Sequence, residues 1–154
     1  MAVYYLDTSA LAKRYVQEVG TAWVLELTDP VSGHDIYVVR ITGPEMVAAF
    51  FRKVRTGEAT LVDASRAVDN FKADFGNQYQ IVEVTAGLAD RAMVLAQRHA
   101  LRGYDAVQLA AAFELHTLRN TMRLRPLTFI SADTNLIRAA ELERLIADDP
   151  NNHT

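Results

Sequence analysis

The fold of this chain is decided by Val3-Tyr4-Tyr5-Leu6-Asp7-Thr8-Ser9, close to the start of the sequence. The first four of these residues form an unbroken apolar and aromatic run, which is typical of a central strand buried on both faces of a sheet. A carboxylate and two hydroxyl residues follow, and residues of these types begin helices. We therefore expect Asp7 at the carboxyl edge of an α/β sheet, the edge at which such sheets bind ligands.

Outward from this stretch, segments with strand and helix periodicity alternate to the end of the chain. Such alternation predicts a three-layer α/β sandwich, with a mostly parallel sheet of four to five strands, helices on both faces and right-handed crossovers. The expected strands are Val3–Leu6, Ile36–Ile41, Gln80–Val84, Leu127–Ile130 and a short edge strand near Leu145–Ala147. The expected helices are Thr8–Glu18, Thr21–Leu27, Pro44 to Gly57, Leu61–Phe75, Ala89–Leu101, Ala106–Leu118 and Leu136–Leu142.

Length and composition fit one compact domain. The chain has 154 residues, of which 50% are hydrophobic, so we expect a single domain over residues 1–147 and a polar C-terminal tail over residues 148–154. No apolar run reaches the roughly 20 residues of a membrane span, the first strand begins without a signal peptide, and cysteine is absent. These features predict a cytoplasmic protein without disulfides or thiolate metal sites. Because the net charge is −3, binding of a polyanion would depend on a local basic patch or on bound cations.

Four carboxylates stand where the predicted strands pass into helices. Asp7 and Asp133 directly follow strands, Glu45 falls in the first turn of the helix after the second strand, and Asp105 follows the break at Gly103. Because parallel strands end at the same edge of a sheet, we expect these side chains to crowd together. Crowded carboxylates repel one another unless protons or cations intervene. An all-oxygen cluster is the ligand set that Mg²⁺ or Mn²⁺ prefers, so the pattern predicts a metal site.

Each acid also has an ordinary structural interpretation. Asp7, Asp105 and Asp133 could each cap the N-terminus of a helix. The segment Thr42-Gly43-Pro44-Glu45 has the form of a capping box, with Pro44 at the first helical position. Ser, Thr and Asn cap helices as well as Asp does, however, and here an acid occurs at all four junctions. This conjunction favours the metal site over four independent caps.

Four segments around these acids resemble, in order and spacing, the acidic motifs of PIN-domain nucleases. The segments are Leu6–Lys13, Arg40–Glu45, Gly103–Ala112 and Phe129–Asp133, and the resemblance extends from Val3 to about Ala147. The likeness is strongest to the VapC toxins of toxin–antitoxin pairs. It implies a PIN-like fold and a metal-dependent endoribonuclease that acts as a toxin and forms a homodimer. It also implies inhibition by a VapB-type antitoxin, whose C-terminal segment lies along the active-site groove.

The resemblance implies roles for individual residues as well. The ligands of one or two Mg²⁺ or Mn²⁺ ions, used to hydrolyse RNA phosphodiester bonds, would be Asp7, Glu45, Asp105 and Asp133. Many relatives carry a further acid two places after the fourth aspartate, where this chain has an amide, Asn135, whose oxygen can still be a ligand. Residues that could hydrogen-bond the carboxylates or a metal water are Thr8, Ser9, Ser131 and Asn135. Candidate RNA contacts are Lys13, Arg14 and Arg102, with solvated surface cations as the alternative for each.

Other functions are consistent with acids at strand ends. A phospho-receiver domain needs an acidic pair near its start and a late lysine, and a phosphohydrolase with an aspartyl nucleophile needs Asp-x-Asp. Neither pattern occurs in Asp7-Thr8-Ser9 or Ser131-Ala132-Asp133. Two alternatives stay open: a non-catalytic PIN-like binding module, and a PIN nuclease with a housekeeping role in RNA processing.

Overall fold

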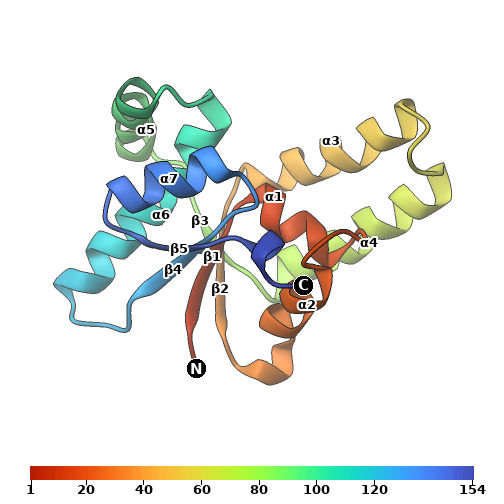
Figure 1. Cartoon of the computed structure of the whole chain (residues 1–154), viewed down its shortest axis with the longest axis horizontal. Coiled ribbons are helices and arrows are strands. Elements are labelled where there is room, and N and C mark those ends of the chain that lie inside the picture. Colours follow the sequence, from red (N-terminus) through yellow and green to blue (C-terminus); the bar gives the residue numbers. More distant parts are fainter.

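The computed structural model describes all 154 residues and has a five-stranded parallel sheet at its centre (Figure 1). The strands are β1 (Val3–Leu6), β2 (Asp35–Val39), β3 (Gln80–Val82), β4 (Leu127–Ile130) and β5 (Ile146–Asp148). Their order across the sheet is β3-β2-β1-β4-β5, and every neighbouring pair is parallel. The predicted α/β architecture is therefore confirmed, and β1 is the central strand that its apolar run indicated.

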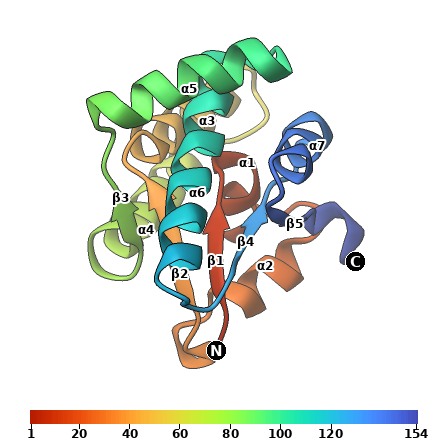
Figure 2. The same ribbon diagram turned by 90° about the vertical axis from the view of Figure 1, so that its left-hand side faces the viewer.

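Helices cover both faces of this sheet (Figure 2). One face packs against α5 (Ala86–His99), α6 (Gly103–Thr121) and α7 (Thr134–Leu142). The other packs against α1 (Thr8–Leu11), α2 (Thr21–Thr28), α3 (Thr42–Arg55) and α4 (Leu61–Asn77). Because side chains alternate along a strand, Tyr5 of β1 enters the first layer and Leu6 enters the second. None of the helices combines the length and the apolar composition needed to cross a membrane.

Helices α3 and α4 form a hairpin that extends away from the sheet (Figure 1). Met46 and Phe50 on α3 are buried in the layer shared with α4 and the sheet. Ala48, Arg52 and Arg55 lie on the exposed side of the same helix. The exposed side of α3 therefore carries two arginines near the C-terminal end of the helix.

The first helix is shorter than the sequence predicts. Instead of continuing to Glu18, α1 ends at Leu11 and a single 3-10 turn, η1, covers Ala12–Arg14. Lys13 is buried and its Nζ lies 3.2 Å from Glu18 Oε2. Residues five apart do not share a face of an α-helix. The pair can form because the chain leaves the helix and turns back toward α2.

Helix α3 begins differently from the prediction, and the expected capping box is wrong. The helix starts at Thr42, with Ile41 at the N-cap position and no side-chain cap, so Pro44 is its third residue. The Thr42 hydroxyl is fully buried and accepts a hydrogen bond from Gln108 Nε2 at 3.0 Å. This hydroxyl therefore serves a tertiary contact, and no capping bond is available to explain the acid at Glu45.

The last residues of the chain fold back onto α2. A 3-10 turn, η3 (Pro150–Asn152), follows β5, and the ring of His153 stacks on Trp23 with centroids 4.0 Å apart. The carbonyl of Pro150 lies against Gly20, where a Cβ would approach its oxygen to 2.3 Å. Gly20 also has a φ of +84°, so this contact requires glycine on both counts.

Candidate active site

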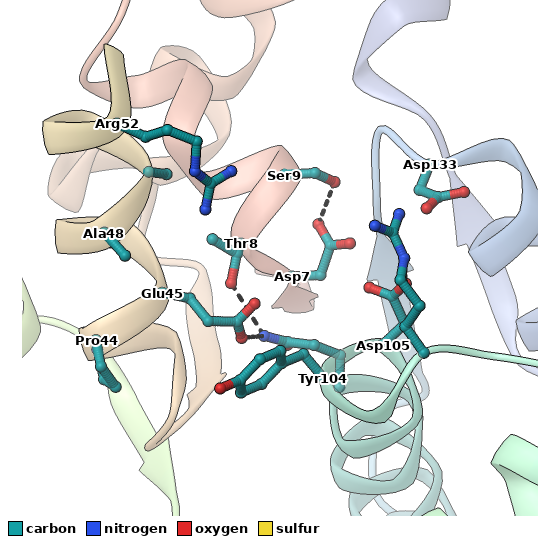
Figure 3. A pocket seen from close by; sticks show the side chains of 13 residues that line it. Asp7, Thr8, Ser9, Pro44, Glu45, Ala48, Arg52, Tyr104, Asp105 and Asp133 are labelled. Atoms are coloured by element: carbon teal, nitrogen blue, oxygen red, sulfur yellow. Dashed lines mark hydrogen bonds and ion pairs between the residues drawn. The ribbon is translucent and has the colours of Figure 1, made fainter. Parts of the chain in front are cut away.

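A cavity of about 640 Å³ opens at the carboxyl edge of the sheet (Figure 3). All four acids predicted from the sequence line it: Asp7 after β1, Glu45 in the first turn of α3, Asp105 in the first turn of α6 and Asp133 after β4. The parallel strands deliver two of these residues and the starts of two helices deliver the others. The structure therefore brings together, at one place, acids that lie on four separate segments of the sequence.

Asp7 is the most firmly held of the four. Its side chain is 3% exposed, and both carboxylate oxygens accept hydrogen bonds. Oδ1 accepts from Ser9 Oγ at 2.7 Å and from the backbone N–H of Ala10 at 2.9 Å, and Oδ2 accepts from Ser131 Oγ at 2.6 Å. Burial nevertheless raises the pKa of Asp7 from 3.8 to about 6, and the charge of Asp105 acts in the same direction. The three hydrogen bonds oppose that rise.

Glu45 is held by an amide that the sequence analysis did not single out. Gln108 lies on α6 and is 2% exposed. Its Nε2 donates to Glu45 Oε1 at 3.1 Å, to Thr42 Oγ1 at 3.0 Å and to Thr8 Oγ1 at 3.1 Å. An amide nitrogen carries two hydrogens, so the three acceptors share them. Glu45 is thereby tied to α1 and α6 as well as to its own helix.

The orientation of this amide is set by a tyrosine in the core. Tyr5 is fully buried, and its hydroxyl donates to Gln108 Oε1 at 2.8 Å. Burial, followed by the charges of Asp7 and Glu45, raises the pKa of Tyr5 well above 10, so the hydroxyl keeps its proton and remains a donor. The Gln108 oxygen must then face Tyr5 and the nitrogen must face Glu45. A chain of hydrogen bonds thus links the hydrophobic core to the cavity.

Asp105 is the electrostatic centre of the cavity. Burial is the main cause of the raised pKa of Glu45 and of Asp105 itself. The charge of Asp105 also raises the pKa of Asp7 and of Glu45, and the charge of Asp133 raises that of Asp105. Arg102 opposes this rise, with Nε 3.6 Å from Asp105 Oδ2, although its side chain is 88% exposed. The four acids therefore interact as one negatively charged group.

Asp133 combines a capping role with its place in the cavity. Its Oδ1 accepts from the backbone N–H of Asn135 at 2.9 Å and of Leu136 at 3.2 Å, which caps α7. The backbone N–H of Asp133 donates to Ser131 Oγ at 3.1 Å, so Ser131 connects this acid to Asp7. Asn135 is exposed and does not line the cavity.

The basic residues divide differently from the sequence expectation. Arg102 lines the cavity, but Lys13 and Arg14 do not. Lys13 is buried against Glu18, and Arg14 Nη1 donates to Oη of Tyr79, the residue before β3, at 2.7 Å. Arg52, an exposed residue of α3, also lines the cavity and extends toward Thr8 and Ser9 (Figure 3).

The chemistry of the donor set fits a hard divalent cation. Four carboxylates supply only oxygen ligands, and three of them have raised pKa values, partly because their charges repel one another. A cation among them would relieve that repulsion. In the present side-chain arrangement, no three acidic or histidine side chains converge closely enough to form a ready metal site. The fit is therefore one of charge and ligand type.

Comparison with known proteins finds relatives that are named ribonucleases. No family model matches it. It is 37% identical over 116 residues to Ribonuclease VapC45 of Mycobacterium tuberculosis strain CDC 1551 / Oshkosh, and equally to Ribonuclease VapC49 of strain H37Rv. In both cases the match covers 73% of this chain and 76% of the relative.

Solved structures agree on the fold. PAE2754 from Pyrobaculum aerophilum superimposes with a TM-score of 0.64 at 18% identity, over 98% of this chain and 91% of that one. VapBC2 from Rickettsia felis, bound to a DNA fragment from its promoter, gives 0.59 at 14% identity over 96% and 98% of the two chains. FitAcB from Neisseria gonorrhoeae gives 0.57 at 14% identity over 98% and 99%.

The parallel sheet and the acidic cavity at its carboxyl edge define a PIN-like domain. The sequence identity to the mycobacterial proteins identifies the family within this fold class. The chain belongs to the VapC ribonuclease family.

Proposed function

We propose that this protein is a divalent-metal-dependent endoribonuclease, which hydrolyses RNA phosphodiester bonds and acts as the toxin of a toxin–antitoxin pair. The observation that carries the proposal is the meeting of Asp7, Glu45, Asp105 and Asp133 in one cavity. Only Asp105 has an ion-pair partner, Arg102, so one side-chain cation stands against four acids. Membership of the VapC ribonuclease family supports RNA as the substrate.

The four carboxylates would hold Mg²⁺ or Mn²⁺. When bound, such an ion supplies positive charge at the reacting phosphate and a water that ionises near neutral pH. The chain's own contribution is to hold the ligands in place. Ser9 and Ser131 donate to the two oxygens of Asp7 and fix the plane of its carboxylate, while Gln108 orients Glu45. With a pKa of about 6, Asp7 is mostly ionised at neutral pH and is ready to bind a cation.

We extend the proposal to a VapB-type antitoxin and a homodimer as partners. The R. felis VapBC2 structure and a toxin–antitoxin complex from Klebsiella pneumoniae, with TM-scores of 0.59 and 0.54, support a protein partner. The surface of the chain is also consistent with partners. Large apolar side chains that are more than half exposed occur on α4 and α5, at Leu61, Val62, Met93 and Val94.

Cleavage of a single-stranded RNA tests the catalytic proposal directly. The wild type should cleave with Mg²⁺ or Mn²⁺ and stop in EDTA, and Asp105→Asn should cleave at least about a hundredfold more slowly, with an unchanged far-ultraviolet dichroism spectrum. Asp69→Asn, which removes an exposed acid of α4 outside the cavity, is the matched control and should cleave as the wild type does. Full activity in Asp105→Asn would remove Asp105 from the site.

Expression in cells separates the toxin from the two alternatives. A toxin should arrest growth when expressed alone, and co-expression of its cognate antitoxin should relieve the arrest. A housekeeping nuclease would cleave RNA without arresting growth, and a non-catalytic binding module would not cleave it at all. Growth arrest that persists unchanged in Asp105→Asn would have a cause other than RNA cleavage.

A further inference from the structure

Two of the four cations on α3 and in the acidic cavity already have ion-pair partners. Lys53 of α3 lies between Glu18 and Glu58, each with an oxygen 3.8 Å from its Nζ, and Arg102 lies beside Asp105. Arg52 and Arg55, on the same helix as Lys53, form no ion pair and no side-chain hydrogen bond. Both are exposed. Two guanidinium groups are thus free beside a strongly acidic site.

These two arginines share a second hollow with an aromatic ring. A cavity of about 380 Å³ is lined by Ala48, Phe51, Arg52 and Arg55. Ala48 and Arg52 also line the acidic cavity, so the two hollows adjoin along α3. The four residues stand at i, i+3, i+4 and i+7 and share one face of the helix. Phe51 is 38% exposed, which is unusual for a phenylalanine and leaves part of its ring accessible.

The charge of this face selects the type of ligand that it can bind. The only ionisable groups that line the hollow are the guanidinium groups of Arg52 and Arg55, and no carboxylate lines it. Arginine binds phosphate through two parallel N–H···O bonds. Arg52 and Arg55 are three residues apart, about 4.5 Å along the helix axis, so they can engage one phosphate or two neighbouring ones. An aromatic ring beside phosphate contacts provides a stacking surface for a base without selecting its sequence.

We propose that Phe51, Arg52 and Arg55 form a binding track for single-stranded RNA, along which the strand leaves the acidic cavity. Arg52 holds the phosphate nearest the carboxylates, Arg55 holds the backbone further along α3, and Phe51, which lines the same hollow, supports a neighbouring base. This inference rests on the proposed ribonuclease function and deepens it. It also accounts for the direction of Arg52, which extends from α3 toward Thr8 and Ser9 (Figure 3), because a phosphate that enters among four acids needs a positive group beside it.

Fluorescence anisotropy with a short fluorescein-labelled single-stranded RNA, in EDTA so that no cleavage occurs, measures the track separately from catalysis. Arg52→Ala should weaken binding about tenfold at low salt and Arg55→Ala about threefold. Each should reduce the slope of log K against log salt concentration by about 0.7, because one phosphate contact is lost. Arg52→Lys should keep most of the slope but lose part of the affinity. Phe51→Leu should weaken binding about fivefold without changing the slope.

Arg125→Ala is the matched control, since Arg125 is exposed and precedes β4 at the opposite edge of the sheet. It should bind RNA as the wild type does. Unchanged affinity and slope in both Arg52→Ala and Arg55→Ala, while the wild type still binds and cleaves RNA, would overturn the track and leave the ribonuclease function standing. If these variants instead lose affinity only for poly-glutamate, the face binds acidic peptides and the proposal is wrong. A wild type that neither binds nor cleaves RNA would reject the ribonuclease function and the track with it.

Discussion

The cavity contains two kinds of carboxylate. Asp7 and Asp133 each cap a helix, Asp7 by accepting from the Ala10 N–H and Asp133 by accepting from two N–H groups of α7. Glu45 and Asp105 cap nothing, although both stand in the first turn of a helix. A strand-end aspartate can therefore serve structure and chemistry at once. The two acids without a capping bond are the clearer sign of function, because no local structural role accounts for them.

The largest expected effect is the loss of activity, without loss of stability, when either non-capping acid is replaced. Glu45→Gln and Asp105→Asn should each lower single-turnover RNA cleavage by at least about a hundredfold, because a ligand charge is lost. Neither substitution should lower the free energy of unfolding without metal. Burial raises the pKa of both carboxyl groups, so their charged forms destabilise the folded state. Urea titration in EDTA supplies the second measurement. A variant that is both inactive and strongly destabilised would show that Glu45 or Asp105 also supports the fold, as the capping acids Asp7 and Asp133 do.

The pH dependence of stability sharpens the contrast for Asp7. Its pKa is raised from 3.8 to about 6, so the folded state binds the proton more tightly than the unfolded state. Stability is therefore highest below about pH 4 with respect to this group and falls as the pH rises to about 6. The full change is about 3 kcal/mol, at about 1.4 kcal/mol for each pKa unit. Asp7→Asn should flatten this fall in metal-free urea titrations between pH 4 and pH 7. An equally steep fall in the variant would assign the titration to another group.

Removal of Gln108 should have an intermediate effect. Gln108→Leu leaves the Tyr5 hydroxyl and the Thr42 hydroxyl buried without their partner, at a cost of about 1–3 kcal/mol of unfolding free energy. The double variant Tyr5→Phe/Gln108→Leu removes both partners of one bond and should recover part of that loss. Thermal and urea unfolding of the single and double variants measure the difference. If Gln108→Leu alone is as stable as the wild type, the network does not hold Glu45 in place.

The smallest effect tests the capping difference itself. Asp133→Ala should cost about 1 kcal/mol because α7 loses its cap, whereas Asp133→Asn keeps a capping oxygen and should not lower stability. Asp105→Ala should cost nothing of this kind, because Asp105 is not a cap. Melting temperatures in EDTA compare the three variants. Equal losses in Asp133→Ala and Asp105→Ala would erase the distinction between the two kinds of acid.

The sequence was sufficient to predict the fold and the meeting of the four acids at one edge of the sheet, because both depend on local patterns. An apolar run followed by an aspartate marks a buried strand and its carboxyl edge, and parallel strands must bring such edges together. Gln108 was missed because its partners lie 63 to 103 positions away, and in the sequence it is one polar residue in an alanine-rich helix. The only local signal was its position three residues after Asp105, on the same helix face.

Basic residues were harder to place than acids. Arg52 lies on the exposed side of α3, and nothing in the local sequence indicates that this side borders the acidic cavity. Lys13 is the last residue of the first acidic motif. Because α1 ends early, the Lys13 side chain turns inward to Glu18. Tertiary structure decides which partners a long, flexible side chain contacts, and helical periodicity does not indicate those partners.

Paired thermal melts in EDTA and in millimolar Mn²⁺ test the central claim, that the four acids form one cation-binding site, most directly. A bound cation removes the repulsion among the carboxylates, so Mn²⁺ should raise the melting temperature of the wild type. Asp105→Asn and Asp133→Asn should melt at or above the wild-type temperature in EDTA and gain little from Mn²⁺. Asp69→Asn should respond as the wild type does. If the wild type and the cavity variants respond to Mn²⁺ identically, the four acids do not share a metal site.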